Sequence, residues 1–122
     1  MAIHESGENY LEAILLLGAG DKDVHSVEVA RRIGVSKPTV TKAIKILVND
    51  GFVEMDGVHL CLTDKGRARA QAVYEKHLVI TDYWRLQGVP PAIAERDACR
   101  MEHIVSEETF AVMKKFVEQN KK

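Results

Sequence analysis

The segment from residue 26 to residue 62 constrains the fold more than any other part of the chain. Two short amphipathic stretches, residues 26–33 and 36–50, are separated by a few residues that include Gly34, and each begins with a serine suited to cap a helix. A helical pair with a tight, glycine-containing joint is typical of a helix-turn-helix. The sequence therefore predicts two helices in this arrangement.

A predicted β-hairpin follows the second of these helices directly. Residues 52–55 and 58–62 are strand-like segments on either side of Asp56-Gly57, a dipeptide that tolerates the positive φ of a tight turn. A hairpin in this position is the wing of a winged helix, and it makes the assignment much more specific than the helical pair alone. Its tip carries no lysine or arginine, so we expect it to add little affinity for phosphate.

The remainder of the chain is predicted to be helical. Apolar spacing predicts one helix from Ser6 to the Gly18-Ala19-Gly20 stretch, and three more at about residues 64–86, 92–103 and 107–119. Thr63 is expected to cap the helix that follows the wing. We therefore expect a mostly α protein, with an N-terminal winged helix-turn-helix, a small two-stranded wing and a helical second part.

The distribution of charge along the chain supports a partner of negative charge. The net charge is only −1, but residues 31–76 carry nine lysines and arginines against five acids, whereas residues 1–30 carry six acids against Lys22 alone. The basic middle of the chain coincides with the predicted helix-turn-helix. Double-stranded DNA is therefore the expected partner.

The sequence contains no pattern that predicts export or a membrane span. The N-terminus lacks the charged-then-apolar order of a signal peptide, and no apolar run is long enough for a membrane helix. We expect a cytoplasmic protein without a membrane partner. Only Cys61 and Cys99 are present, so both are expected to be thiols, with Cys61 buried in the wing.

The first turns of the second helix carry the side chains best placed to read DNA. A recognition helix enters the major groove through its N-terminal residues, whose free amides also favour phosphate. Hydroxyls can bond to phosphate or a base edge, methyl groups can contact thymine, and lysines supply charge. The candidate DNA-binding residues are Ser36, Lys37, Pro38, Thr39, Thr41, Lys42 and Lys45. The alternative is that the serine only caps the helix and the lysines form a solvated face.

A second set of side chains has the spacing of metal ligands. Cys99, Glu102 and His103 stand at i, i+3 and i+4, which would place them on one helical face, with Glu95 one turn earlier. Donors elsewhere that could complete such a site are Asn9, Glu12 and His77. Mixed nitrogen, oxygen and sulfur donors suit Fe(II), Mn(II), Co(II) or Zn(II) rather than Mg(II). A buried core histidine beside surface polar residues is the alternative.

Over nearly its whole length the chain resembles the DtxR/MntR family of iron- and manganese-dependent transcriptional repressors. The matching stretches are Glu8-Asn9-Tyr10-Leu11-Glu12-Ala13-Ile14, Ser36-Lys37-Pro38-Thr39-Val40-Thr41, Leu62-Thr63-Asp64-Lys65-Gly66, Lys76-His77-Leu78 and Asp97-Ala98-Cys99-Arg100-Met101-Glu102-His103. The last stretch is the most specific. The resemblance implies a DNA-binding domain at residues 1–63 and a metal-binding and dimerisation domain at residues 64–122, the short, two-domain type without an SH3-like third domain.

The resemblance also implies a ligand set, with departures that bear on the metal. The positions that match family ligands are Asn9, Glu12, His77, Cys99, Glu102 and His103. A neutral amide at Asn9 fits neither the carboxylate of the manganese branch nor the thioether of the iron branch, so it should weaken binding. Cys99 follows the iron branch and Glu12 the manganese branch. Thr81 replaces an acid of a secondary site, for which Glu95 could compensate.

The implied function is repression controlled by a metal. A homodimer loaded with Fe(II) or Mn(II) would bind operator DNA and control genes of metal homeostasis, and Co(II), Ni(II) or Zn(II) could substitute. The alternative is a metal-independent winged-helix regulator that senses oxidation at Cys99 or a small organic ligand. An enzyme with Cys99 as nucleophile and His103 as base is disfavoured, because no oriented third group or oxyanion site accompanies them. We therefore expect no enzymatic activity.

Overall fold

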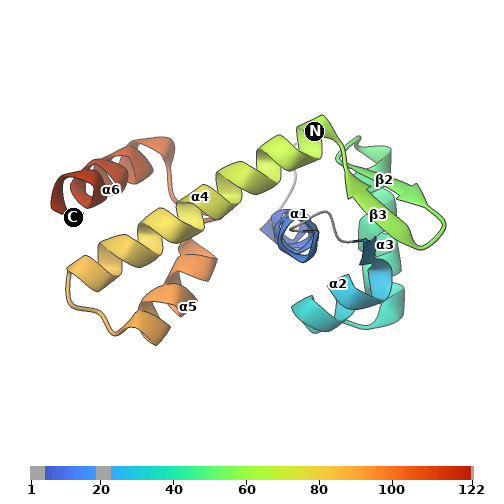
Figure 1. The fold of residues 1–122 in the computed structure, drawn as a ribbon, viewed down its shortest axis with the longest axis horizontal. Helices are drawn as coiled ribbons and strands as arrows, with labels where there is room; N and C mark the ends of the chain where they lie inside the picture. Colours follow the sequence, from blue (N-terminus) through green and yellow to red (C-terminus); the bar gives the residue numbers. More distant parts are fainter. Residues whose placement is uncertain (1–4, 19–22, 122) are drawn as a thin grey trace. The chain divides into compact units, whose positions relative to one another are not determined.

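The computed structural model describes residues 5–18 and 23–121, and these contain six helices and three short strands (Figure 1). Their order is α1 (Glu5–Leu17), β1 (Val24–His25), α2 (Ser26–Ile33), α3 (Lys37–Asn49), β2 (Val53–Asp56), β3 (His59–Leu62), α4 (Asp64–Leu86), α5 (Pro91–Met101) and α6 (Glu107–Asn120). The chain divides into two compact units, Met1–Gln71 and Ala72–Lys122, with α4 passing from one to the other. The predicted mostly α fold class with a winged helix-turn-helix is confirmed.

The first unit is held together by large apolar side chains from its three helices. Leu11 of α1, Val29 of α2, and Val40 and Ile44 of α3 are completely buried, and Phe52, which follows α3, is 1% exposed. Burying a side chain of this kind stabilises a fold by roughly 1.5–3 kcal/mol. The apolar faces predicted from the sequence therefore meet in one core, and the opposite face of α3 remains exposed.

The sheet of this unit has three strands rather than the two predicted. Its order is β1-β3-β2, and both pairs are antiparallel, with Val24 opposite Leu60 and Met55 opposite Leu60. The two residues of β1 are too few to show alternation, so no sequence pattern predicts this strand.

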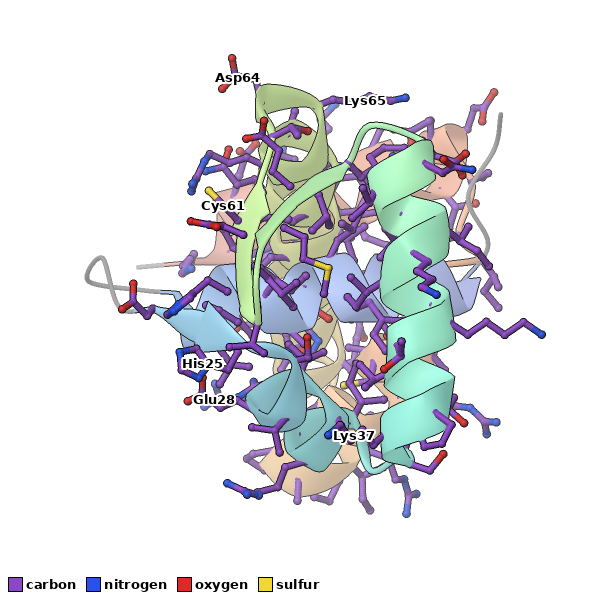
Figure 2. All side chains as sticks on the ribbon, turned by 90° about the vertical axis from the view of Figure 1, so that its right-hand side faces the viewer. His25, Glu28, Lys37, Cys61, Asp64 and Lys65 are labelled. Atoms are coloured by element: carbon purple, nitrogen blue, oxygen red, sulfur yellow. The ribbon has the colours of Figure 1, made fainter. Side chains whose placement is uncertain are left out.

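The expectation that Cys61 is buried is wrong. Leu60 and Leu62 of β3 face the core, so Cys61, which lies between them, points to the opposite face of the sheet and is exposed (Figure 2). Its thiol is free of a disulfide. The period of two along a strand fixes this orientation.

The start of α2 also differs from the prediction. His25, not Ser26, is the N-cap residue, and its backbone N–H donates to Glu28 Oε1 at 2.9 Å. The N–H of Ser26 donates instead to the carbonyl oxygen of Val58 at 3.3 Å, so the start of α2 is paired with the wing. Val27 in the first turn of α2 is 52% exposed, whereas Val29 and Ala30 are the buried residues of this helix.

The predicted ends of the other helices in this unit agree more closely. Ser36 caps α3 by accepting a hydrogen bond from the N–H of Thr39 at 3.3 Å, as predicted. Helix α1 ends at Leu17, and Gly18 donates to the carbonyl oxygen of Ile14 at 3.0 Å. Ala19 and Gly20, the rest of the predicted stop signal, lie outside the described residues.

The start of α4 lies against the joint between α3 and β2. Thr63 Oγ1 accepts from the N–H of Gly66 at 3.0 Å, as a capping residue does, and donates to the carbonyl oxygen of Gly51 at 2.6 Å. A Cβ atom at Gly66 would overlap the carbonyl oxygen of Phe52. Only glycine allows the two backbones to approach this closely.

We predict that Gly66→Ala lowers the free energy of unfolding by about 2 kcal/mol, because overlap with a backbone carbonyl forces the two segments apart. At an open helical position the same change would stabilise the protein by up to about 1 kcal/mol. Urea denaturation measures the difference. Gln71→Ala, an exposed position on the same helix, is the matched control. Equal or higher stability of the Gly66 variant would contradict the close approach.

The second unit has a separate core formed by the rest of α4 with α5 and α6. Ile80 of α4 and Ala98 of α5 are completely buried, and Phe110 and Met113 of α6 pack against them. The predicted break is present: α4 ends at Leu86 and α5 begins at Pro91. No helix within the described residues is both long and apolar enough to cross a membrane.

Ion pairs add to the connection between α4 and α6. They join Lys76 Nζ to Glu107 Oε2 at 3.0 Å, Lys114 Nζ to Glu75 Oε2 at 2.9 Å and Lys121 Nζ to Asp82 Oδ2 at 3.2 Å. Each has at least one half-exposed partner, so each contributes at most about 1 kcal/mol. The apolar core, rather than these pairs, therefore fixes the position of α6 on α4.

Candidate metal centre

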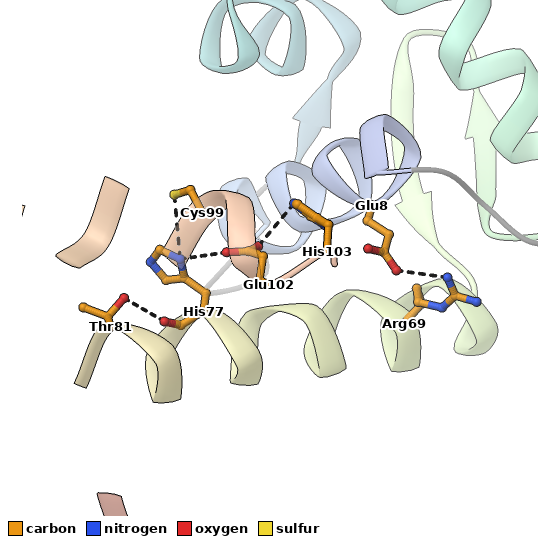
Figure 3. A network of polar contacts seen from close by, with 7 residues as sticks. All are labelled: Glu8, Arg69, His77, Thr81, Cys99, Glu102 and His103. Atoms are coloured by element: carbon orange, nitrogen blue, oxygen red, sulfur yellow. Dashed lines mark hydrogen bonds and ion pairs between the residues drawn. The ribbon is translucent and has the colours of Figure 1, made fainter. Parts of the chain in front are cut away.

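Side chains from α4 and from the end of α5 form a compact group of metal-ligand atoms in the second unit (Figure 3). His77 Nδ1 lies 2.9 Å from Glu102 Oε1 and 3.8 Å from Cys99 Sγ. One ligand atom from each of these three residues lies within 4.8 Å of the other two. The structure therefore brings together three of the residues predicted as ligands, from two different helices.

The end of α5 positions two of these side chains. The helix ends at Met101, and not near His103 as the spacing predicted. Glu102 nevertheless keeps helical dihedral angles, with φ −58° and ψ −23°, and its N–H donates to the carbonyl oxygen of Ala98 at 2.9 Å. The i, i+3 relation between Cys99 and Glu102 therefore survives, while His103 stands in the turn that follows.

Glu102 is buried in this unit, with a side chain that is 1% exposed. Its Oε1 is bonded to His77, and its Oε2 lies 3.6 Å from His103 Nε2 without a hydrogen-bond partner among the described residues. A buried carboxylate with an unsatisfied oxygen costs several kcal/mol. A bound cation would offset this cost, so the residues present fit a metal.

His77 has two further neighbours on α4, Thr81 and Tyr74. Thr81 Oγ1 donates to the carbonyl oxygen of His77 at 2.7 Å, and the ring of Tyr74 is nearly parallel to the imidazole, with centroids 6.1 Å apart. Thr81 thus holds the backbone of a candidate ligand rather than offering a charge of its own. Glu95, the predicted secondary ligand, is exposed and does not belong to the compact group.

Two further predicted ligands, Asn9 and Glu12, lie on α1 in the first unit. Asn9 and Glu12 are half-buried and line a cavity of about 250 Å³ together with Arg32 of α2. The participation of Asn9 and Glu12 in a metal site stays a prediction. The sequence did not indicate that Arg32 lines this cavity, because nothing in the pattern of α2 distinguishes its side chain from a solvated cation.

The predicted DNA-reading residues share one exposed surface at the start of α3. All seven are exposed, and the hydroxyls of Ser36 and Thr39 are 2.8 Å apart. Lys37 stands at the first position of the helix (Figure 2). The alternative that Ser36 caps the helix is realised, but capping uses its oxygen as an acceptor and leaves the lysines beside it unaffected.

Comparison with protein families covers both units. The N-terminal DNA-binding domain of iron dependent repressors matches residues 2–58, and their metal binding and dimerisation domain matches residues 63–122. The transcriptional regulator MntR of Salmonella typhimurium is 39% identical over 118 residues, which cover 93% of this chain and 73% of MntR. The iron-dependent repressor IdeR of Mycobacterium tuberculosis is 34% identical over 109 residues, covering 85% of this chain and 46% of IdeR.

Two solved structures with the same fold are those of longer proteins. The manganese regulator SloR superposes with a TM-score of 0.81 at 27% identity, covering 97% of this chain and 55% of that one. A manganese-dependent transcriptional repressor in complex with manganese gives a TM-score of 0.83 at 27% identity, with coverage of 92% and 52%. The chain spans about half the length of these two proteins.

The fold and the donor group define a class: winged-helix regulators of transcription with a metal-binding domain, which are not enzymes. Within that class, this chain belongs to the iron-dependent repressor family, the family of MntR and IdeR. The resemblance predicted from the sequence is confirmed.

We predict that Glu102→Gln raises the free energy of unfolding of the metal-free protein by about 1 kcal/mol. Glutamine has nearly the same shape as glutamate, but it places no charge in the buried site. The same variant should lose the rise in melting temperature that Mn(II) gives the unaltered protein. Glu108→Gln, an exposed position on α6, should change neither quantity. Destabilisation of the metal-free Glu102 variant would show that the carboxylate is already satisfied without a metal.

Proposed function

We propose that this chain is a metal-dependent transcriptional repressor that binds operator DNA as a homodimer when loaded with Fe(II) or Mn(II), and so controls genes of metal homeostasis. The observation that carries the proposal is the group formed by His77, Cys99 and Glu102, with its buried and incompletely bonded carboxylate. Membership of a family that joins a DNA-binding domain to a metal binding and dimerisation domain supports it.

We assign the metal to the ligands predicted from the sequence: Asn9, Glu12, His77, Cys99, Glu102 and His103. Bound there, the metal would supply positive charge that compensates the Glu102 carboxylate and a Cys99 thiolate. Glu95 is assigned at most a secondary role, because it is exposed and is not a member of the compact group. We also propose the two domains predicted from the sequence: residues 1–63 bind DNA, and residues 64–122 bind the metal and form the dimer.

Iron and manganese are the proposed physiological metals. Relatives include a manganese-dependent repressor in complex with manganese and the iron-dependent repressor IdeR. A structure of the relative ScaR contains Zn²⁺, which supports zinc as a substitute, and we extend this to Co(II) and Ni(II). The same relatives disfavour the alternative of a metal-independent regulator. The thiol of Cys99 is a softer donor than a carboxylate and should favour Fe(II) over Mn(II).

The exposed start of α3 is the proposed reading surface for DNA. The N-terminal amides of α3 would favour phosphate, and the lysines would neutralise it. Two copies related by a two-fold axis would place two recognition helices about 34 Å apart, one turn of duplex DNA. Because the wing tip lacks basic side chains, affinity should depend mainly on α3.

Metal would control DNA binding through a difference in affinity between two states. A metal that binds the DNA-competent arrangement more tightly shifts the population toward that arrangement. By linkage, operator DNA must raise the affinity for metal by the same factor. The metal-free protein is expected to stay folded, since each unit has its own apolar core.

We predict that Glu102→Ala and His103→Ala abolish metal-dependent operator binding while leaving a folded dimer, because both remove proposed ligands. Fluorescence anisotropy of a labelled promoter fragment, with Mn(II) or anaerobic Fe(II) and with EDTA, measures the effect. Circular dichroism and size-exclusion chromatography verify fold and dimer. Metal-stimulated binding retained by both variants would reject the assigned site, and tight binding that EDTA leaves intact in the unaltered protein would reject the proposed function.

We predict that Lys42→Ala weakens operator binding about 5-fold at unchanged metal affinity, because it removes a contact to phosphate or guanine. If the contact is to phosphate, the slope of log affinity against log salt should also fall by about 0.9. Lys115→Ala on α6, which is likewise exposed, is the matched control. Operator affinity equal to that of the unaltered protein would remove Lys42 from the interface.

A further inference from the structure

Arg69 of α4 connects α1 to the joint between the recognition helix and the wing, all within the first unit. Its Nη1 donates to Glu8 Oε2 of α1 at 3.1 Å (Figure 3). Its guanidinium carbon lies 5.8 Å from the centroid of the Phe52 ring. The side chain of Glu8 is 16% exposed and that of Arg69 37% exposed, so the pair is partly shielded from water.

Phe52 is firmly joined to the end of α3. Its N–H donates to the carbonyl oxygen of Leu47 at 2.9 Å, and its side chain is 1% exposed. Lys65, one turn before Arg69 on α4, also contacts this joint: its Nζ lies 4.3 Å from the centroid of the Phe52 ring and donates to the carbonyl oxygen of Asp50 at 2.9 Å. A displacement of the Phe52 ring therefore acts directly on the last turn of the recognition helix.

At the other end of the connection, Glu8 stands beside the candidate ligands of α1. It directly precedes Asn9 and lies one helical turn before Glu12. A shift or rotation of α1 that accompanies ligation by these residues must change the geometry of the Glu8–Arg69 pair. A charge-assisted hydrogen bond from a planar guanidinium is sensitive to such a change, since its strength depends on both distance and direction.

We infer that Arg69 is a positioning residue that couples the metal-bearing helix α1 to the recognition helix through the chain of contacts from Glu8 through Arg69 to Phe52. This inference rests on the proposed function, because it assumes that α1 supplies metal ligands. Arg69 thereby sets how strongly metal changes operator affinity. It does so without binding the metal and without contributing to operator affinity in the absence of metal.

The test compares Arg69→Gln and Arg69→Lys with the unaltered full-length chain. The ratio of operator affinities with and without Mn(II), measured by anisotropy, is the coupling factor. We expect Arg69→Gln to lower this factor about 3- to 10-fold. Mn(II) affinity of the DNA-free protein, measured from the paramagnetic resonance of free Mn(II), should change less than about 2-fold. Operator DNA raises the affinity for Mn(II), and in Arg69→Gln this increase should be reduced by the same factor as the coupling factor.

Arg69→Lys keeps the charge but loses the planar fork, so its coupling factor should lie between those of the other two proteins. If Arg69→Gln does not fold, the coupling factor of Arg69→Lys alone tests the inference. Glu75→Gln, which breaks the exposed pair with Lys114 in the second unit, is the matched control and should leave the factor unchanged.

Two results would overturn the inference while the proposed function stands. One is an unchanged coupling factor in both Arg69 variants. The other is an equal loss of operator affinity with and without Mn(II), which would mean that Arg69 contacts DNA or only stabilises the fold. If the unaltered chain binds its operator equally with and without metal, the proposed function itself fails, and the inference fails with it.

Discussion

The buried carboxylate of Glu102 is the constraint on which the proposed metal site of the second unit depends. The fold removes this charge from water and bonds one of its oxygens to His77, while the other lacks a hydrogen-bond partner among the described residues. A carboxylate in this state costs stability that an apolar side chain would not. The arrangement makes physical sense if a cation compensates it, and Cys99 stands close enough to share that cation.

The first unit depends on a different constraint, the close approach of α4 to the joint between α3 and the wing. Gly66 permits that approach, and Thr63 bonds both to Gly66 and to the backbone of Gly51. The recognition helix, the wing and the start of α4 are therefore joined by backbone contacts, and they should move together. Arg69 follows one turn later on the same helix, where it reaches α1 through Glu8.

The sequence predicted the helices and the wing well, because their apolar faces repeat with clear periods and Ser36 and Thr63 cap as expected. It missed β1, which is too short to show a period, and it placed Cys61 in the core because the alternation of β3 was not applied to it. The spacing of Cys99 and Glu102 revealed part of the metal centre, although α5 ends before His103. The Glu8–Arg69 pair joins residues far apart in the chain, and no local pattern predicts such a contact.

The most direct test of metal binding and of its link to DNA is one titration with Co(II), followed by the thiolate-to-metal charge-transfer absorption, with and without operator DNA. If Cys99 ligates a metal that favours the DNA-bound state, the band appears on titration, and its midpoint moves to lower Co(II) concentration when DNA is present. Absence of the band would contradict ligation by Cys99. The same midpoint with and without DNA would contradict the coupling.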